Sequence, residues 1–332
     1  MSKQLSSPEL EVTQDHFIHL KDGRYIHYVE CLPRGESKGD VLFVHGFPDY
    51  WGTWKDQLSA AALAGYRAIA IDTPGYGRSS ALEAVTDCSL ISVTDMLAEF
   101  VSKLCPRTPI PMLVGHDFGA FICWGVGARY PDLFERLTII NVPHMTRFLE
   151  GLTTWSQMRK SWYIWLFQLP RLPEFIMFRE DYHAVRETLR TVGAQPRKIE
   201  DVEEHVLHWR SNPATVTSAI NFYRALGRGL WGINTRSWGL FAMMQRILKF
   251  FTGGGFRAQS YQEIVGGTAL QLPTQVIWGS NDLALNVSMA DPPLDLVPRK
   301  RPTIFLPASH FVHWDLPDEV NKILLSFLNE AV

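Results

Sequence analysis

Residues 111–119 read PMLVGHDFG, an apolar run that leads into the pentapeptide Gly115–Gly119. Such a short apolar run predicts a buried strand, and a helical pattern follows it as far as about Arg129. The pentapeptide has the small-x-nucleophile-x-small form of a nucleophile elbow, a sharp turn between a strand and a helix that exposes one reactive side chain. Glycine is needed where the backbone bends so tightly. The stretch therefore predicts an α/β protein with a reactive group at the end of a strand.

Asp117 stands at the nucleophile position of this turn. A carboxylate is already anionic at pH 7, so it can attack a saturated carbon without a base and form an ester of the protein itself. The alternative is that Asp117 only caps the helix that follows it, a position where aspartate is common. The residues expected further along the chain favour the nucleophile.

Two of these residues follow strand-like runs, first an acid and then a histidine. Asp282 comes just after the apolar run 275–278, and His310 comes after the run 303–306. Nucleophile, acid and histidine is the chain order of α/β-hydrolases. An imidazole held by a carboxylate can deprotonate the water that attacks an ester on Asp117.

Other assignments remain open for these two positions. Asp282 could be an ordinary turn residue, and His313 is a second histidine close to the same strand. His310 is favoured because it lies nearer the strand end, from which it could reach the elbow. Asn141 follows an earlier strand at a place where an acid could also lie, but its amide cannot act as the carboxylate, which favours Asp282.

The sequence His45-Gly46-Phe47-Pro48 follows another apolar run and predicts a tight loop beside the elbow. Water attack on an ester of Asp117 would create a tetrahedral oxyanion. The backbone N–H groups of Phe47 and Phe118 are the predicted donors to it, each typically worth about 3 kcal/mol. A simple turn is the alternative.

Short apolar strands alternate with helical patterns along most of the chain, and this indicates a mostly parallel, twisted sheet flanked by helices. The alternation stops between about Val142 and Gly267, where helical patterns occur without convincing strands. An insertion of this size is a second module rather than a loop. We therefore expect an α/β-hydrolase core from residues 1–141 and 268–332, with a helical cap at 142–267.

Composition excludes several other classes of protein. The 332 residues carry a net charge of −2, which argues against a dedicated nucleic-acid binder. The four cysteines form no C-x-x-C pair and have no metal-ligand spacing, which is typical of buried thiols in a reducing compartment. No signal peptide or apolar run of about 18 residues is visible. We expect a cytoplasmic protein that needs neither a metal nor a cofactor.

Five motifs together resemble the epoxide hydrolases of the α/β-hydrolase superfamily, over nearly the whole chain. They are HGFPD at 45–49, DTPGYGRS at 72–79, GHDFG at 115–119, WGSND at 278–282 and Ser309-His310. Further likeness at NVPH (141–144), YIWLFQLP (163–170), PEF (173–175) and NFYR (221–224) is similar to the abhydrolase-type epoxide hydrolases of animals. This resemblance implies that two cap tyrosines, Tyr163 and Tyr223, donate to the epoxide oxygen. It also implies a substrate pocket that includes Pro48, Trp165 and Phe311, and a small hydrophobic epoxide and water as the substrates.

Two positions depart from that family, which commonly has tryptophan after the nucleophile and after the catalytic histidine. Here they are Phe118 and Phe311, which puts the pocket shape and the choice of substrate in doubt. Haloalkane dehalogenases also use an aspartate nucleophile, but an indole N–H after it holds the halide, and Phe118 lacks that group. A non-catalytic relative that binds lipid or protein through its cap is the third hypothesis.

One segment stands out from the neutral average. Residues 205–262 contain seven Lys or Arg and no Asp or Glu, so the rest of the chain has a balance of −9. Within it, 237–251 shows a broad apolar helical face opposite Arg246 and Lys249. This helix either roofs the pocket or lies on an anionic membrane surface, with 226–257 as the peripheral contact. The oligomeric state does not follow from the sequence.

Overall fold

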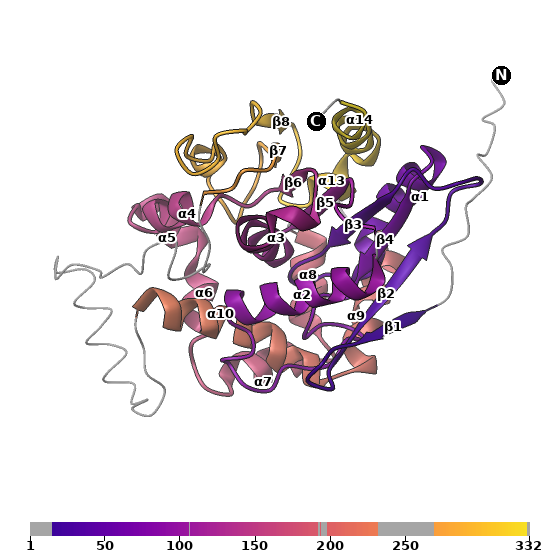
Figure 1. Cartoon of the computed structure of the whole chain (residues 1–332). Coiled ribbons are helices and arrows are strands. Elements are labelled where there is room, and N and C mark those ends of the chain that lie inside the picture. Colours follow the sequence, from indigo (N-terminus) through magenta and orange to yellow (C-terminus); the bar gives the residue numbers. More distant parts are fainter. Residues whose placement is uncertain (1–14, 106, 192, 194–197, 232–268, 331–332) are drawn as a thin grey trace, which may run out of the picture.

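A computed structural model of the chain describes residues 15–105, 107–191, 193, 198–231 and 269–330 (Figure 1). Its centre is an eight-stranded sheet of order β1-β2-β4-β3-β5-β6-β7-β8. The strands from β4 to β8 in that order are parallel, and β1 and β2 join the edge antiparallel. The strands are β1 (His16–His19), β2 (Tyr25–Cys31), β3 (Asp40–Val44), β4 (Arg67–Ile71), β5 (Met112–His116), β6 (Leu137–Ile140), β7 (Thr274–Gly279) and β8 (Ile304–Leu306). The predicted α/β-hydrolase sheet, mostly parallel and flanked by helices, is confirmed.

Helices cover both faces of this sheet, which is why its central strands are apolar on both sides. In β3, Val41 and Phe43 belong to the core beneath α1 (Lys55–Leu63) and α14 (Pro317–Leu328). Leu42 and Val44 belong to the opposite core, beneath α2 (Leu90–Leu104) and α3 (Phe118–Arg129). All four side chains are buried, so each parallel strand is fixed from two directions.

The helix α2 illustrates how the local sequence sets an element's limits. Ser89 lies just before it and accepts a hydrogen bond from the backbone N–H of Ser92, which satisfies one of the donors at the helix start. One face of α2 buries apolar side chains such as Val93 and Leu97 against the sheet core, where both are 0% exposed. The apolar period of the sequence therefore corresponds to the packed face.

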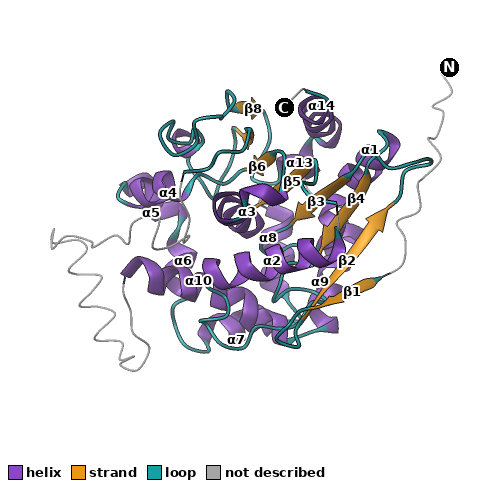
Figure 2. Ribbon diagram, viewed as in Figure 1, coloured by secondary structure: helices purple, strands orange, loops and turns teal. Residues whose placement is uncertain are grey.

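Between β6 and β7, the described part of the chain forms helices joined by loops and contains no strand (Figure 2). It contains α4 (Met145–Leu152), α5 (Trp155–Lys160), α6 (Trp162–Leu166), α7 (Leu172–Phe178), α8 (His183–Thr191), α9 (Ile199–Ser211) and α10 (Ala214–Trp231). In Figure 1, α6, α7, α9 and α10 lie together along the lower side of the view. The short α13 (Val312–Asp315) precedes α14 in the last part of the chain.

Sequence analysis singles out 226–257 as a membrane contact. Residues 226–231 of this segment form the end of α10, and the rest of it lies outside the described residues. The helix predicted at 237–251 lies wholly outside them. Among the helices that are described, none combines the length and the apolarity needed to cross a bilayer. All four cysteines are free and buried, as their spacing predicts.

Candidate active site

The elbow is formed where β5 passes directly into α3. Asp117 is the single residue between them, with φ 50° and ψ −129°, a left-handed conformation that is strained for a residue with a side chain. Close packing explains the glycine two residues later, because a Cβ on Gly119 would lie 2.2 Å from the carbonyl oxygen of Val44. Asp117 precedes the helix, but its side chain makes no capping hydrogen bond. Its carboxylate points elsewhere.

Each oxygen of the Asp117 carboxylate has one polar neighbour. Oδ1 accepts a hydrogen bond of 2.7 Å from the backbone N–H of Phe47, and Oδ2 lies 3.3 Å from Nε2 of His310. A Cβ on Gly46 would lie 2.4 Å from both Oδ1 and the backbone nitrogen of Phe118, so this nitrogen flanks the same side of the carboxylate. The Phe47 and Phe118 N–H groups and the Asp117 carboxylate therefore meet at Gly46.

The Asp117 carboxylate keeps its negative charge although it is largely buried. Burial raises the pKa of this carboxyl, but the hydrogen bond from His310, its positive charge and the Phe47 N–H together hold the pKa below its usual value. The carboxylate side chain is still 16% exposed, and that exposed part belongs to a cavity described below. An anionic carboxylate therefore faces the cavity.

His310 lies between two carboxylates. Its Nδ1 lies 2.8 Å from Oδ2 of Asp282, on the side opposite Asp117. Burial lowers the pKa of His310, but the Asp282 and Asp117 carboxylates outweigh burial and raise it above the ordinary histidine value. Asp282 is itself fixed through Oδ1, which accepts the backbone N–H groups of Ala284 and Leu285 at 2.7 and 2.9 Å. Asp117, His310 and Asp282 thus form one continuous line.

Asn141 has a contact that the sequence argument missed. It lies at the end of β6 with φ 51°, is 0% exposed, and donates from Nδ2 to Oδ2 of Asp282 at 2.8 Å. Its Oδ1 accepts the backbone N–H of Gly279 at 2.9 Å. Its place after a strand was visible in the sequence, but only its lack of a carboxylate was considered there. An amide that can donate to one group and accept from another was the available signal.

The helix α5 holds the loop that carries Asp282. Lys160 donates from Nζ to the backbone oxygen of Asp282 at 2.7 Å, and Gln157 donates to that of Ala284 at 2.9 Å. Oε1 of Gln157 also accepts the backbone N–H of Asn286 at 2.9 Å. The helical segment between β6 and β7 therefore positions the loop of the buried acid, which no motif in the sequence indicated.

His313, the alternative to His310, lies elsewhere. Its Nε2 is 2.9 Å from the hydroxyl of Thr53, and its ring packs on Trp54 at a centroid distance of 4.5 Å. It belongs to a buried group of possible metal ligands together with Asp49 and His116. The contact with Asp282 is made by His310 and not by His313.

A cavity of about 320 Å³ opens on Asp117. Its wall is mostly apolar, with five charged or titratable members, Asp117, Lys160, Tyr163, Tyr223 and His310. It is lined by Phe47, Pro48, Asp117, Lys160, Trp162, Tyr163, Leu166, Phe167, Ile176, Met177, Ala184, Val185, Thr188, Tyr223, Leu283, Ala284, His310 and Phe311.

Tyr163 of α6 and Tyr223 of α10 are both in this wall, with their rings 5.7 Å apart and nearly perpendicular. Neither hydroxyl has a hydrogen-bond partner in the part of the chain that the structure describes. Burial and the charge of Asp117 raise the pKa of both phenols, so both are protonated at neutral pH. Two phenolic donors therefore share a cavity with the carboxylate.

Two of the three predicted pocket residues, Pro48 and Phe311, line the cavity, and Trp165 does not. The helix explains this correction. Tyr163, Leu166 and Phe167 are three and four residues apart and share one face of α6, whereas a residue two positions after Tyr163 points to the other side. Trp165 is half-buried there.

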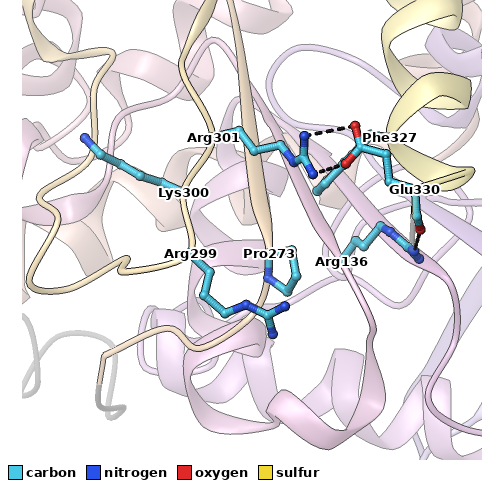
Figure 3. A pocket seen from close by; sticks show the side chains of 7 residues that line it. All are labelled: Arg136, Pro273, Arg299, Lys300, Arg301, Phe327 and Glu330. Atoms are coloured by element: carbon cyan, nitrogen blue, oxygen red, sulfur yellow. Dashed lines mark hydrogen bonds and ion pairs between the residues drawn. The ribbon is translucent and has the colours of Figure 1, made fainter. Parts of the chain in front are cut away.

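A second cavity, of about 280 Å³, lies at the opposite, amino-terminal ends of β6, β7 and β8 (Figure 3). Its wall is basic, with Arg136, Arg299, Lys300 and Arg301. Glu330 neutralises part of this charge, since its carboxylate pairs with Arg301 and its backbone oxygen accepts from Arg136 (Figure 3). Its lining contains neither a histidine nor an aspartate, unlike the cavity at the carboxyl ends of the strands.

Comparison with known proteins agrees with this geometry. Residues 40–317 match the family described as "alpha/beta hydrolase fold". The chain is 30% identical to Epoxide hydrolase 2 of Caenorhabditis elegans over 330 residues, which cover 97% of this chain and 82% of the relative. It is 29% identical to Epoxide hydrolase 4 of Homo sapiens over 327 residues, covering 95% of this chain and 78% of the relative.

Among solved structures, the chain resembles a Bacillus megaterium epoxide hydrolase crystallised with an inhibitor. The TM-score is 0.75 at 24% identity, and the match covers 95% of this chain and 100% of the other. The likeness extends along the full length of that chain.

Proposed function

Because the chain belongs to the α/β-hydrolase fold family, and within it to the epoxide hydrolases, we propose that it converts an apolar epoxide to a vicinal diol through an ester on Asp117. One observation carries this proposal. The Asp117 carboxylate, held by the Phe47 N–H at 2.7 Å, shares a cavity with the two protonated phenols of Tyr163 and Tyr223. A nucleophile and two acids in one apolar site suit the opening of a strained, uncharged ring.

In the first step, a carboxylate oxygen of Asp117 attacks one epoxide carbon and the C–O bond to the ring oxygen breaks. The negative charge moves to that oxygen, which takes a proton from one tyrosine while the other donates a hydrogen bond. His310 is protonated before this step, because its pKa is raised, and its proton restores the phenol. The step ends with a neutral ester and a neutral imidazole.

Formation of the ester prepares His310 for the second step. Once Asp117 is esterified, one of the two carboxylates that raise the pKa of His310 has lost its charge. The imidazole can then take a proton from water, whose oxygen attacks the carboxyl carbon of the ester. Asp282 stabilises the imidazolium that forms, through the 2.8 Å contact with Nδ1.

Collapse of the tetrahedral intermediate completes the reaction. Its oxyanion is stabilised by the backbone N–H groups of Phe47 and Phe118, which flank Asp117 beside Gly46. The diol oxygen leaves with the acidic proton of the new carboxyl group, so Asp117 returns as a carboxylate and His310 as an imidazolium. The sum is epoxide plus water giving diol, and no step calls for a cofactor.

The division of the chain follows the same assignment. Residues 1–141 and 268–332 carry the nucleophile, the acid and the base and form the catalytic core. Residues 142–267 carry both tyrosines and form the cap. The epoxide would lie between the two parts, in the cavity whose apolar wall includes Leu166, Phe167 and Met177.

The experiment is to trap the ester. The variant His310→Gln, mixed with a panel of apolar epoxides, should gain the mass of one epoxide, and peptide mapping should place that mass on Asp117. Asp117→Asn is the matched control and should gain nothing. Lack of an adduct with every epoxide would refute the proposal, and halide release from haloalkanes by the wild-type chain would favour dehalogenation instead.

A further inference from the structure

A buried cluster of ligating side chains lies directly behind the elbow. Asp49, His116 and His313 each place one possible ligand atom within 4.8 Å of the others, and all three side chains are fully buried. Asp49 follows the Phe47-Pro48 loop, His116 precedes the nucleophile, and His313 lies three residues after His310. None of them lines the cavity that opens on Asp117.

The hydrogen bonds of His116 determine which of its nitrogens carries a proton. Its Nε2 lies 2.9 Å from the backbone oxygen of His310, and a carbonyl oxygen only accepts, so Nε2 must donate. The other nitrogen, Nδ1, is buried and makes no hydrogen bond among the described residues.

This nitrogen faces a carboxylate. Nδ1 of His116 lies 3.8 Å from Oδ2 of Asp49, too far for a hydrogen bond between them. Oδ1 of Asp49 lies 2.9 Å from Nε2 of His205, and Oδ2 accepts a hydrogen bond of 3.3 Å from the hydroxyl of Thr53. A buried ring nitrogen and a buried carboxylate oxygen that face each other without a hydrogen bond are both satisfied by a cation that binds between them.

We propose that Asp49, His116 and His313 bind a divalent transition-metal ion of the zinc class. Two imidazoles and one carboxylate are the donor set that such ions prefer, whereas Mg²⁺ and Ca²⁺ prefer oxygen ligands alone. The distance of 3.8 Å between two of the donors requires only a small contraction around an ion with bonds of about 2.0–2.2 Å. His313 contributes a ring nitrogen from a ring that packs on Trp54.

The ion has a structural role in this proposal. Its three ligands come from the loop after β3, the end of β5 and the short helix α13. The ion therefore joins the segments that carry the Phe47 N–H, Asp117 and His310. It touches none of the reacting atoms. A metal on Nδ1 of His116 also strengthens its Nε2–H as a donor to the backbone of His310.

The test uses the purified full-length chain, stripped with a chelator and then titrated with Co²⁺ and Zn²⁺. We expect one ion per chain, visible-region absorption typical of low-symmetry Co²⁺, displacement by Zn²⁺ and a higher Tm with Zn²⁺. In His313→Gln the affinity should fall by more than about 100-fold, since a ligand is lost rather than one of its supports. His19→Gln, at an exposed histidine of the β1 strand, should bind as the wild type does.

Equal Zn²⁺ affinity of His313→Gln and the wild type would overturn the proposal, as would failure of the wild type to bind either ion. If His313→Gln does not fold, anomalous scattering from a zinc-loaded wild-type crystal decides. A peak between Asp49 and His116 supports the site, and a peak elsewhere, for example at His16 and His19, overturns it.

Discussion

Replacing Asn141 by glycine tests whether the side-chain amide that holds the Asp282 carboxylate controls the second chemical step. Glycine tolerates the φ of 51° at this position, so the change removes the amide without adding backbone strain. Asp282 then loses the 2.8 Å hydrogen bond at Oδ2, the same oxygen that contacts His310. Its other oxygen remains held by two backbone N–H groups.

The size of both effects follows from the two shortest hydrogen bonds that are lost, one to Asp282 and one from Gly279. A hydrogen bond to a charged group contributes about 1.5–3 kcal/mol. If the transition state of ester hydrolysis, in which His310 becomes an imidazolium, loses all of this stabilisation, hydrolysis slows by about 10- to 150-fold. The buried N–H of Gly279 also loses its partner, which costs about 1–3 kcal/mol. The free energy of unfolding should therefore fall by about 2.5–6 kcal/mol in total.

Rapid-quench mass spectrometry measures both chemical steps. The alkylation of Asp117 does not need a neutral His310, so its rate should change little, and the ester should accumulate during turnover of Asn141→Gly. Leu97→Ala is the matched control, because it empties a buried position of α2 at a cost of about 2–5 kcal/mol without touching the site. An unchanged hydrolysis rate in Asn141→Gly, or an equal loss in both steps, would refute the reasoning.

Three further predictions concern the cap, and each has its own readout. Tyr223→Phe and Tyr163→Phe should each lower the rate of alkylation by about 100- to 1,000-fold, with Tm almost unchanged because neither hydroxyl has a partner among the described residues; a loss below threefold in both would contradict their assigned role. Burial lowers the pKa of His144 to about 4, so the unfolded chain takes up this proton first as the pH falls. Urea unfolding should show that the wild type loses about 2 kcal/mol more than His144→Asn between pH 7.5 and pH 5, and parallel losses would argue against it. Arg224→Met should destabilise the chain by about 2–4 kcal/mol in thermal unfolding, because it leaves the part-buried Glu174 carboxylate without its two-point ion pair. An unchanged Tm would show that this pair contributes nothing.

The fold could be predicted from the sequence because its strands are short, apolar and separated by helical periods. Runs such as 41–44 and 137–140 are buried on both faces, a pattern that is typical of a parallel sheet covered by helices on both sides. The positions of Asp117, Asp282 and His310 were also predictable. Strand ends in a parallel sheet meet at one edge, so chain order and strand position suffice to bring the three residues together.

The contacts between the sheet and the inserted helices were not predictable in the same way. Lys160 and Gln157 hold backbone oxygens of the acid's loop, and backbone acceptors leave no trace in the sequence. Trp165 was placed in the pocket by the family resemblance, although the helical period turns it away from Tyr163 and it is not among the lining residues. A pattern of residue types gives the chemistry, and the orientation of a short helix must come from its packing.

A single turnover in water labelled with ¹⁸O tests the central claim most directly. With the wild-type chain in excess over an epoxide substrate, the ester mechanism predicts a diol that contains no ¹⁸O. The label should instead appear in the carboxylate of Asp117, in the peptide that spans residues 115–119. A diol that carries ¹⁸O after that first turnover, with Asp117 unlabelled, would mean that water attacks the epoxide directly and would contradict the account.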